Sequence, residues 1–116
     1  MFKIKLSCIY IIEVGEYYYV GKSLDWFSRL QSHYTLLKQN KHHSPKLQSL
    51  YNDFGIDMFN FRVLEYISLT EYKKTSQIKG KQLIKEFNKH LLTREKYWMK
   101  QYSITFCLNK DNKHFS

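Results

Sequence analysis

A β-hairpin near the N-terminus is the sequence feature that most limits how this chain can fold. Apolar residues occupy most positions over residues 5–12, which is typical of a strand that is buried on both faces. A short link at residues 14–16 contains a glycine, and aromatic and β-branched residues resume over residues 17–20. Two such segments around a glycine predict an antiparallel hairpin that brings Tyr10 and Tyr19 near each other.

Helices and further strands follow the hairpin. Helical spacing of apolar residues and capping signals predict helices, and alternation of apolar and polar residues predicts strands. The capping signals are Ser23 or Asp25 for the first helix, and Ser44, Pro45 and Gly55 for the second. The predicted helices cover residues 25–38, 44–54 and 81–102, the predicted strands cover residues 58–67 and 104–108, and residues 70–80 are partly helical. The fold class is therefore α/β of the α+β kind: a small three-stranded sheet, mixed or antiparallel, made of the hairpin plus a third strand and flanked by helices.

Size and composition limit the domain organisation. The 116 residues are enough for one domain with a core and too few for two, so we expect a single domain over residues 1–116. No apolar run approaches the roughly 18 residues that a membrane span needs. Cys8 and Cys107 are far apart in sequence, and no apolar signal segment precedes them. These features predict an intracellular protein, in the cytoplasm or with the nucleoid, that is not secreted and has reduced thiols.

The charge of the chain favours a polyanionic partner. Nineteen Lys and Arg residues against ten Asp and Glu residues give a formal charge of +9, spread along the whole sequence. A basic fold of this kind suits nucleic acid. The alternative left open by charge alone is a basic surface that serves solubility and binds nothing charged. Zinc is not expected, because two distant Cys and scattered His residues give no ligand pairs at finger-like spacing.

The helix predicted over residues 25–38 carries two polar residues beside an apolar face. That apolar face consists of Phe27, Leu30, Tyr34 and Leu37. Arg29 and His33 are four residues apart on its flank. We therefore expect Arg29 and His33 at the rim of the core, pointing toward the hairpin.

The last predicted helix has a carboxylate where its pattern predicts an apolar residue. Its apolar face consists of Ile84, Phe87, Leu91, Trp98 and Tyr102. Glu95 completes this stripe, although an ionised carboxylate seldom lies there without a partner because its desolvation is costly. A bound Mg²⁺ ion explains such a carboxylate, since Mg²⁺ takes one or two carboxylates and keeps most of its waters. The alternative is a structural ion pair with a buried lysine or arginine.

Two half-motifs and four single residues occur in a distinctive order. The half-motifs are Cys8-Ile9-Tyr10 and Tyr19-Val20-Gly21, and the residues that follow are Arg29, His33, Glu95 and Asn109. In this order the chain resembles the GIY-YIG endonuclease family, with Cys8 in place of the family's first glycine. The likeness is strongest to the catalytic domain of phage intron and free-standing homing endonucleases, where a loop histidine corresponds to His42. It covers residues 6–109, and the segment before Glu95 is longer than in the family, so we expect residues 70–90 to include an extra helical insertion.

The resemblance implies roles for individual residues. The catalytic residues would be Tyr10, Tyr19, Arg29, His33 and Glu95, with Glu95 as the ligand of Mg²⁺ or Mn²⁺. The general base would be Tyr10, whose unperturbed pKa of ~10 requires nearby cations to favour the phenolate. Arg29 suits a clamp on phosphate because its guanidinium is a planar fork. The bland alternative is that the tyrosines are core aromatics and that Arg29 and His33 are a solvated helix edge.

Contacts with DNA are predicted from the basic residues and, for His42 and Asn109, from the resemblance. We expect Lys22, His42, Lys46 and Asn109 to contact DNA, and further candidates for phosphate contacts are Lys3, Lys5, Lys38, Lys41, Lys96 and Lys100. Adjacent histidines in a basic loop, such as His42 and His43, more often contact phosphate, or nothing, than catalyse. No module that reads bases is visible, so sequence recognition would need a partner, a further domain or a transient homodimer.

The predicted function is therefore a metal-dependent DNA endonuclease that nicks or cuts duplex DNA, of homing, mobile-element or phage type, with no membrane partner. Two alternatives remain open. One is a nucleic-acid-binding module on the same fold whose chemistry has lapsed. The other is an interaction domain whose basic surface meets an acidic protein.

Overall fold

The computed structural model describes residues 5–102 and 106–109. In chain order the elements are β1 (Cys8–Val14), β2 (Tyr17–Ser23), α1 (Trp26–Lys38), α2 (Pro45–Phe54), the 3₁₀ helix η1 (Ile56–Met58), β3 (Phe59–Tyr66), α3 (Leu69–Ser76) and α4 (Lys81–Met99). The strands form one sheet of order β2-β1-β3 in which both pairs are antiparallel, and this confirms the predicted three-stranded sheet flanked by helices. Within the described part of the chain, no helix is long and apolar enough to span a bilayer.

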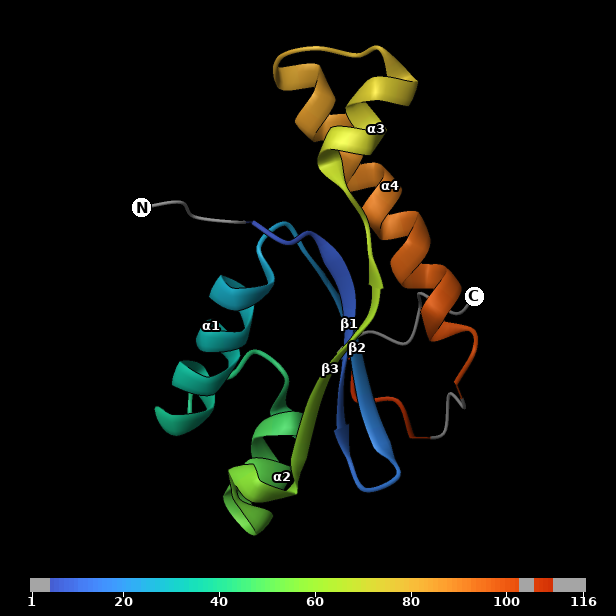
Figure 1. Cartoon of the computed structure of the whole chain (residues 1–116). Coiled ribbons are helices and arrows are strands. Elements are labelled where there is room, and N and C mark those ends of the chain that lie inside the picture. Colours follow the sequence, from blue (N-terminus) through green and yellow to red (C-terminus); the bar gives the residue numbers. More distant parts are fainter. Residues whose placement is uncertain (1–4, 103–105, 110–116) are drawn as a thin grey trace.

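The central strand β1 is covered on both faces, with α1 and α2 on one side of the sheet and α4 on the other (Figure 1). The side chains that face the core under α1 and α2 are Cys8, Tyr10, Ile12 and Val14. Ile9 and Ile11 face the second core, under α4. Burial on both faces confirms the prediction from the apolar run. Cys8 is fully buried in β1, so the position where the family has glycine accepts a small side chain.

The short helices begin and end at the residues that the capping signals predict. Asp25 caps α1 by accepting a hydrogen bond from Ser28 N, and Ser44 caps α2 by accepting one from Leu47 N. Gly55 ends α2 with φ at +80°, a conformation that side chains larger than hydrogen rarely adopt.

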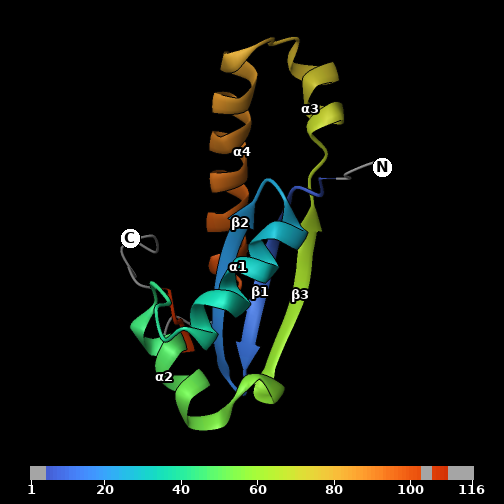
Figure 2. The same cartoon turned by 90° about the vertical axis from the view of Figure 1, so that its left-hand side faces the viewer.

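The helix α1 lies in front of the sheet in Figure 2. The side chains that it turns to the core differ from the predicted ones. Its buried residues are Trp26, His33 and Leu37. Phe27 is 59% exposed and Tyr34 is 42% exposed, so the predicted apolar face is wrong at these two positions. The face that begins at Trp26 is buried instead, because the Trp26 ring packs against Tyr10 with ring centroids 5.0 Å apart. His33 consequently lies in the core and not at its rim.

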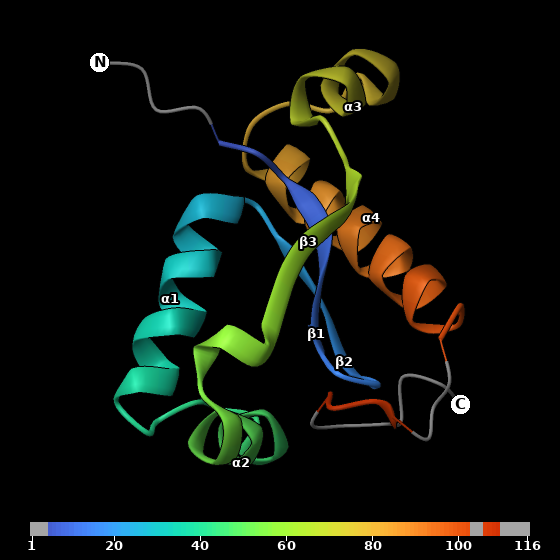
Figure 3. The ribbon, with the colours of Figure 1, turned by 60° about the horizontal axis from the view of Figure 1, so that its bottom comes forward.

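The long helix α4 crosses the opposite face of the sheet (Figure 3). Its buried residues are Leu83, Phe87, Leu91 and Met99. The predicted stripe is confirmed at Phe87 and Leu91, but Ile84 is exposed. Glu65 on β3 anchors the helix, because its carboxylate accepts hydrogen bonds from Arg94 Nε and Trp98 Nε1, both at 2.9 Å.

The segment before α4 adds a small helix to its side. Residues 70–80, predicted to be partly helical, form most of α3 and the link to α4. Tyr72 on α3 packs on Phe87 and His90, with ring centroids 5.3 Å and 5.2 Å apart. These ring contacts hold α3 against the N-terminal half of α4.

The residues after α4 return to the sheet beside β2. Cys107 forms a parallel bridge with Tyr18, and Leu108 N donates a hydrogen bond to Tyr18 O at 2.6 Å. Of the strand predicted over residues 104–108, residues 104 and 105 lie outside the described residues. The described part brings Asn109 next to the second half-motif.

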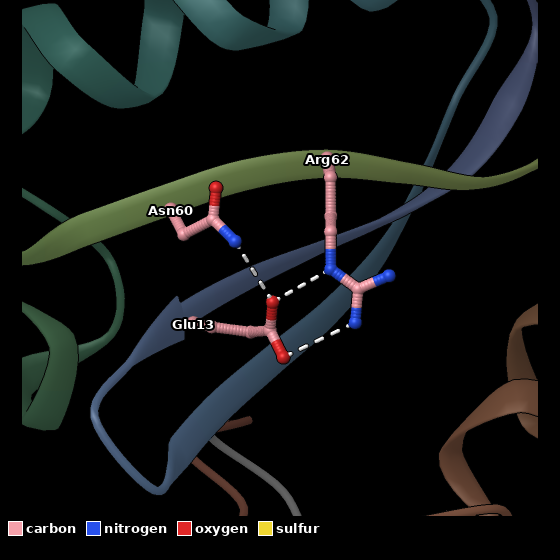
Figure 4. A network of polar contacts seen from close by, with 3 residues as sticks. All are labelled: Glu13, Asn60 and Arg62. Carbon is pink, nitrogen blue, oxygen red and sulfur yellow. Dashed lines mark hydrogen bonds and ion pairs between the residues drawn. The ribbon is translucent and has the colours of Figure 1, made fainter.

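A polar cluster ties β1 to β3 on the sheet (Figure 4). The Glu13 carboxylate accepts hydrogen bonds from Arg62 Nε at 2.7 Å, Arg62 Nη2 at 3.2 Å and Asn60 Nδ2 at 3.2 Å. The hydrogen bonds from Arg62 lower the pKa of the Glu13 carboxyl. None of these three residues was expected in the site, and they act as a tie between strands.

Candidate active site

The Tyr10 phenol lies against the backbone of β2 in the core beneath α1. Tyr10 pairs with Gly21 across the β1–β2 ladder. A β-carbon at position 21 would overlap the Cζ and Oη atoms of Tyr10, so a glycine is needed for the phenol to fit. The glycine of the second half-motif therefore positions the tyrosine of the first.

A chain of hydrogen bonds runs from this phenol through two buried histidines. Tyr10 Oη and His33 Nε2 are 2.6 Å apart, and His33 Nδ1 and His42 Nε2 are 2.7 Å apart. The chain ends at a backbone amide, because Ser44 N donates to His42 Nδ1 at 3.0 Å. The predicted residues Tyr10 and His33 are thus in direct contact, and His42 reaches Tyr10 only through His33.

Tyr19 joins the same group of rings from β2. Its hydroxyl is 2.9 Å from His43 Nε2, and its ring lies edge-on to His33 with centroids 5.5 Å apart. His42 and His43 stack with centroids 4.4 Å apart. We call Tyr10, Tyr19, His33, His42 and His43 the tyrosine–histidine cluster.

Arg29 and Glu95 carry opposite charges, and they shift the pKa values of Tyr10 and Tyr19 in opposite directions. Burial raises the pKa of Tyr10 well above its ordinary value, and the charge of Glu95 adds to this rise while the charge of Arg29 opposes it. Burial likewise raises the pKa of Tyr19 to about 12, again with Glu95 raising it and Arg29 lowering it. The predicted phenols, guanidinium and carboxylate therefore lie in one electrostatic environment.

The two inner histidines are neutral at physiological pH. Burial, with the neighbouring charges of His42 and His43, lowers the pKa of His33 to about 3. Burial and the neighbouring His43 lower the pKa of His42 to about 4. Each ring therefore carries one N–H near neutrality, and neither supplies positive charge to the site.

An open cavity of about 320 Å³ lies between β2, α1 and α4 and contains two of the predicted cations. Lys22 and Arg29 line it together with Ser28, Ser32, Asn88 and Asp25, whose carboxylate accepts a hydrogen bond from Ser28 N as the cap of α1. Two cations with hydroxyl and amide groups offer donors for the oxygens of a phosphate group. The cavity thus presents the positive side of the site to solvent.

The other two residues expected to contact DNA lie elsewhere. Lys46 is exposed on α2, and it lines a different cavity with Tyr17 and Cys107. Asn109 Oδ1 accepts a hydrogen bond from Val20 N at 3.1 Å, and its Nδ2 donates to Val20 O at 2.7 Å. The position of Asn109 favours a role in holding the second half-motif in place.

Glu95 is the group that would hold a metal ion. It lies half-buried on α4, and its charge raises the pKa of both Tyr10 and Tyr19. Within residues 5–102 and 106–109, no group of three or more His, Cys, Asp or Glu side chains is arranged to hold a metal. One carboxylate fits Mg²⁺, which binds through few protein ligands together with waters and substrate phosphate.

Residues that the sequence only weakly indicates complete the site. Ser44 was expected as a helix cap, and its backbone amide also ends the histidine chain. Gln48 Oε1 accepts a hydrogen bond from His42 N, and Gln48 Nε2 donates to Leu37 O. A glutamine in an amphipathic helix carries no signal that it is buried, so only the fold could reveal this second support of His42.

Similarity to known proteins is found at the level of structure. No family model matches the sequence, and no curated protein matches it. A glutamate-to-alanine variant of the catalytic domain of intron endonuclease I-TevI has a TM-score of 0.70 and 26% sequence identity, over 96% of this chain and 99% of that chain. A structure of the catalytic domain of homing endonuclease I-TevI has a TM-score of 0.67 and 27% identity, over 91% and 99%. The chain therefore has the fold of a homing endonuclease catalytic domain, and its resemblance to the GIY-YIG endonucleases is confirmed by structure over nearly its whole length.

Proposed function

We propose that this chain is a metal-dependent endonuclease that hydrolyses phosphodiester bonds in double-stranded DNA, of the homing or mobile-element type. The observation that carries the proposal is the hydrogen-bonded tyrosine–histidine cluster together with an open cavity that Arg29 and Lys22 line. The charges of Arg29 and Glu95 both act on the pKa values of the two phenols. A guanidinium, a carboxylate and two phenols at one place suit the charge that develops on a phosphate during hydrolysis. The structural likeness to the I-TevI catalytic domain supports a nuclease.

Substrate binding is assigned to the cavity that Arg29 and Lys22 line. Arg29 clamps the non-bridging oxygens of the scissile phosphate through its planar fork, and Lys22 contacts the same or a neighbouring phosphate. The exposed Lys46 adds a contact with the DNA backbone on another surface. The net charge of +9 draws the duplex toward these groups.

Tyr10 is the general base in this proposal, and it takes a proton from the attacking water. Burial and Glu95 disfavour its phenolate, whereas Arg29 favours it. The neutral phenol is therefore the resting form, and the substrate complex must bring further positive charge to the site. Tyr19 orients the water or the substrate through its hydroxyl.

The metal of this proposal is Mg²⁺ or Mn²⁺, held by Glu95. When bound, such an ion neutralises charge on the phosphate oxygens and lowers the pKa of coordinated water. Its charge would also offset the effect of Glu95, which raises the pKa of both tyrosines.

Plasmid cleavage tests the proposal. We expect the full chain to convert supercoiled plasmid to nicked or linear DNA in Mg²⁺ and to lose this activity in chelator. Arg29→Ala and Glu95→Gln should reduce the rate by at least about 100-fold while remaining folded. Arg62→Ala is a charge-matched control, because Arg62 is paired with Glu13 away from the cluster, and it should retain activity. Full activity in chelator or in Glu95→Gln would remove the metal role.

A second candidate function is a DNA-binding module without catalysis. The raised pKa of Tyr10 favours it, because a phenol that stays protonated in the complex cannot act as a base. This candidate expects salt-sensitive binding to the duplex with no cleavage in Mg²⁺ or Mn²⁺.

A further inference from the structure

We propose that His42 is a positioning residue that fixes which nitrogen of His33 carries the proton, so that His33 donates its Nε2–H to the Tyr10 oxygen. The inference rests on the proposed function, in which Tyr10 is the base. It deepens that function by giving a role to a histidine that touches neither the substrate cavity nor Tyr10.

The direction of the hydrogen bonds from Ser44 to Tyr10 is set at the Ser44 end. A backbone N–H can only donate, and Ser44 N donates to His42 Nδ1 at 3.0 Å. Nδ1 of the neutral His42 ring is therefore the acceptor, and its proton lies on Nε2. The His42 ring cannot easily rotate away, because it is 7% exposed and its own backbone N–H is bonded to Gln48 Oε1.

The same logic carries the direction inward. His42 Nε2–H points at His33 Nδ1, 2.7 Å away, so Nδ1 of His33 must accept. The two rings are within 20° of parallel, which allows this in-line contact. The proton of the neutral His33 ring then lies on Nε2 and points at Tyr10 Oη, 2.6 Å away.

The opposite direction would place two donors against each other. If Tyr10 donated to His33, the proton of His33 would move to Nδ1 and that of His42 to Nδ1 as well. His42 Nδ1–H would then face Ser44 N–H at 3.0 Å in a buried site. That arrangement leaves two buried donors, Ser44 N–H and His42 Nδ1–H, without an acceptor, at a cost of about 1–3 kcal/mol for each. The proposed direction leaves only the Tyr10 O–H without an acceptor among the described residues, so the opposite direction is disfavoured.

The position of the His33 proton affects the ionisation of the Tyr10 phenol. Its oxygen accepts one hydrogen bond from the protein, and its own proton points away from His33. A hydrogen bond donated to the oxygen favours the phenolate over the phenol. The histidine chain thereby opposes the burial that disfavours the ionised form of the base, and His33 does not remove the Tyr10 proton.

Nitrogen NMR tests this assignment without reference to cleavage. In the full chain labelled with ¹⁵N-histidine at pH 7 and without metal, long-range ¹H–¹⁵N correlations should show His33 and His42 both protonated on Nε2. A proton on Nδ1 of His33 would overturn the inference. The measurement needs no DNA, so its result does not depend on the nuclease function. The tautomer assignment can be correct when the chain does not cleave DNA, and it can be wrong when the chain does.

Two variants whose side chains have the same length separate the effect of hydrogen-bond direction from the effect of packing. His42→Gln keeps an amide N–H that can donate to His33 Nδ1, whereas the carboxylate of His42→Glu can only accept. We expect His33 to stay protonated on Nε2 in His42→Gln and to gain a proton on Nδ1 in His42→Glu. Single-turnover cleavage should be within a few-fold of wild type in His42→Gln and on the order of 100-fold slower in His42→Glu, with DNA affinity unchanged. Equal cleavage rates of two folded variants with different tautomers would overturn the positioning role.

Discussion

Gly21 lies directly opposite Tyr10 on the neighbouring strand, and the phenol of Tyr10 occupies the space that a side chain at position 21 would need. The two half-motifs are therefore one structural unit: the first supplies the phenol, and the second supplies the gap into which it fits.

Gly21→Ala should displace the Tyr10 ring. The new methyl group would overlap the phenol, and the ring is buried against Trp26, so it has little space to retreat. We expect a loss of about 1–3 kcal/mol in the free energy of unfolding, measured by urea denaturation, together with loss of cleavage. The matched control is Gly15→Asn, because position 15 has open space and Asn tolerates its φ of +61°. The two variants being equally stable would contradict this account of the half-motifs.

The amide of Asn109 should be needed to hold β2. In Asn109→Asp the acceptor for Val20 N is kept, but the donor to Val20 O is lost. In Asn109→Ala both hydrogen bonds are lost. We expect its free energy of unfolding to fall by about 1–3 kcal/mol and hydrogen exchange at the Val20 amide to be faster. Unchanged hydrogen exchange at the Val20 amide in Asn109→Ala would show that the two hydrogen bonds of Asn109 do not hold β2.

Acid should unfold the chain through its buried histidines. His33 and His42 bind protons near pH 6.5 when unfolded but only near pH 3 and pH 4 when folded. The unfolded state therefore binds more protons below pH 6.5, so the stability present at pH 7 is lost as the pH falls. The loss between pH 7 and pH 5 is about 2 kcal/mol for each histidine. Denaturation at several pH values checks this, and His42→Gln should reduce the pH dependence by about half between pH 6 and pH 5. An equal slope in that variant would contradict the buried, neutral state of His42.

Lys22 should contribute one phosphate contact. In Lys22→Ala the slope of log K against log salt for duplex DNA should become shallower by about 1, measured by fluorescence anisotropy. Arg62→Ala, which removes a charge already compensated by Glu13, should leave the slope unchanged. If the two variants change the slope equally, binding follows net charge and not the cavity.

The sequence was sufficient for the fold because its signals were local. The apolar run of β1, the Gly15 turn and the caps at Asp25 and Ser44 each act within a few residues, and all were confirmed. The buried face of α1 was not predicted, because Phe27 and Tyr34 are as apolar as Trp26 and only the packing on Tyr10 decides among them.

The sequence singles out candidate site residues but does not indicate how they are connected. The half-motifs, Arg29 and Glu95 stand out by order and by an unusual carboxylate, and the charges of Arg29 and Glu95 both act on the pKa of Tyr10 and of Tyr19. The contact of His33 with His42 joins α1 to the loop before α2, and the ring direction depends on a backbone amide at Ser44. No residue pattern encodes such a contact, so His42 was expected on the DNA surface, whereas it lies buried.

The most direct test of the central claim, that Tyr10, Arg29 and Glu95 act on one phosphate, is the single-turnover rate of duplex cleavage by the double variant Tyr10→Phe/Arg29→Ala beside its single variants. Residues that act as one unit have strongly non-additive effects. We predict that each single variant loses at least about 100-fold and that the double variant is no slower than the slower single variant by more than a few-fold. The shared site would be contradicted if the rate loss of the double variant equalled the product of the two single losses. It would also be contradicted if either single variant cleaved at the wild-type rate.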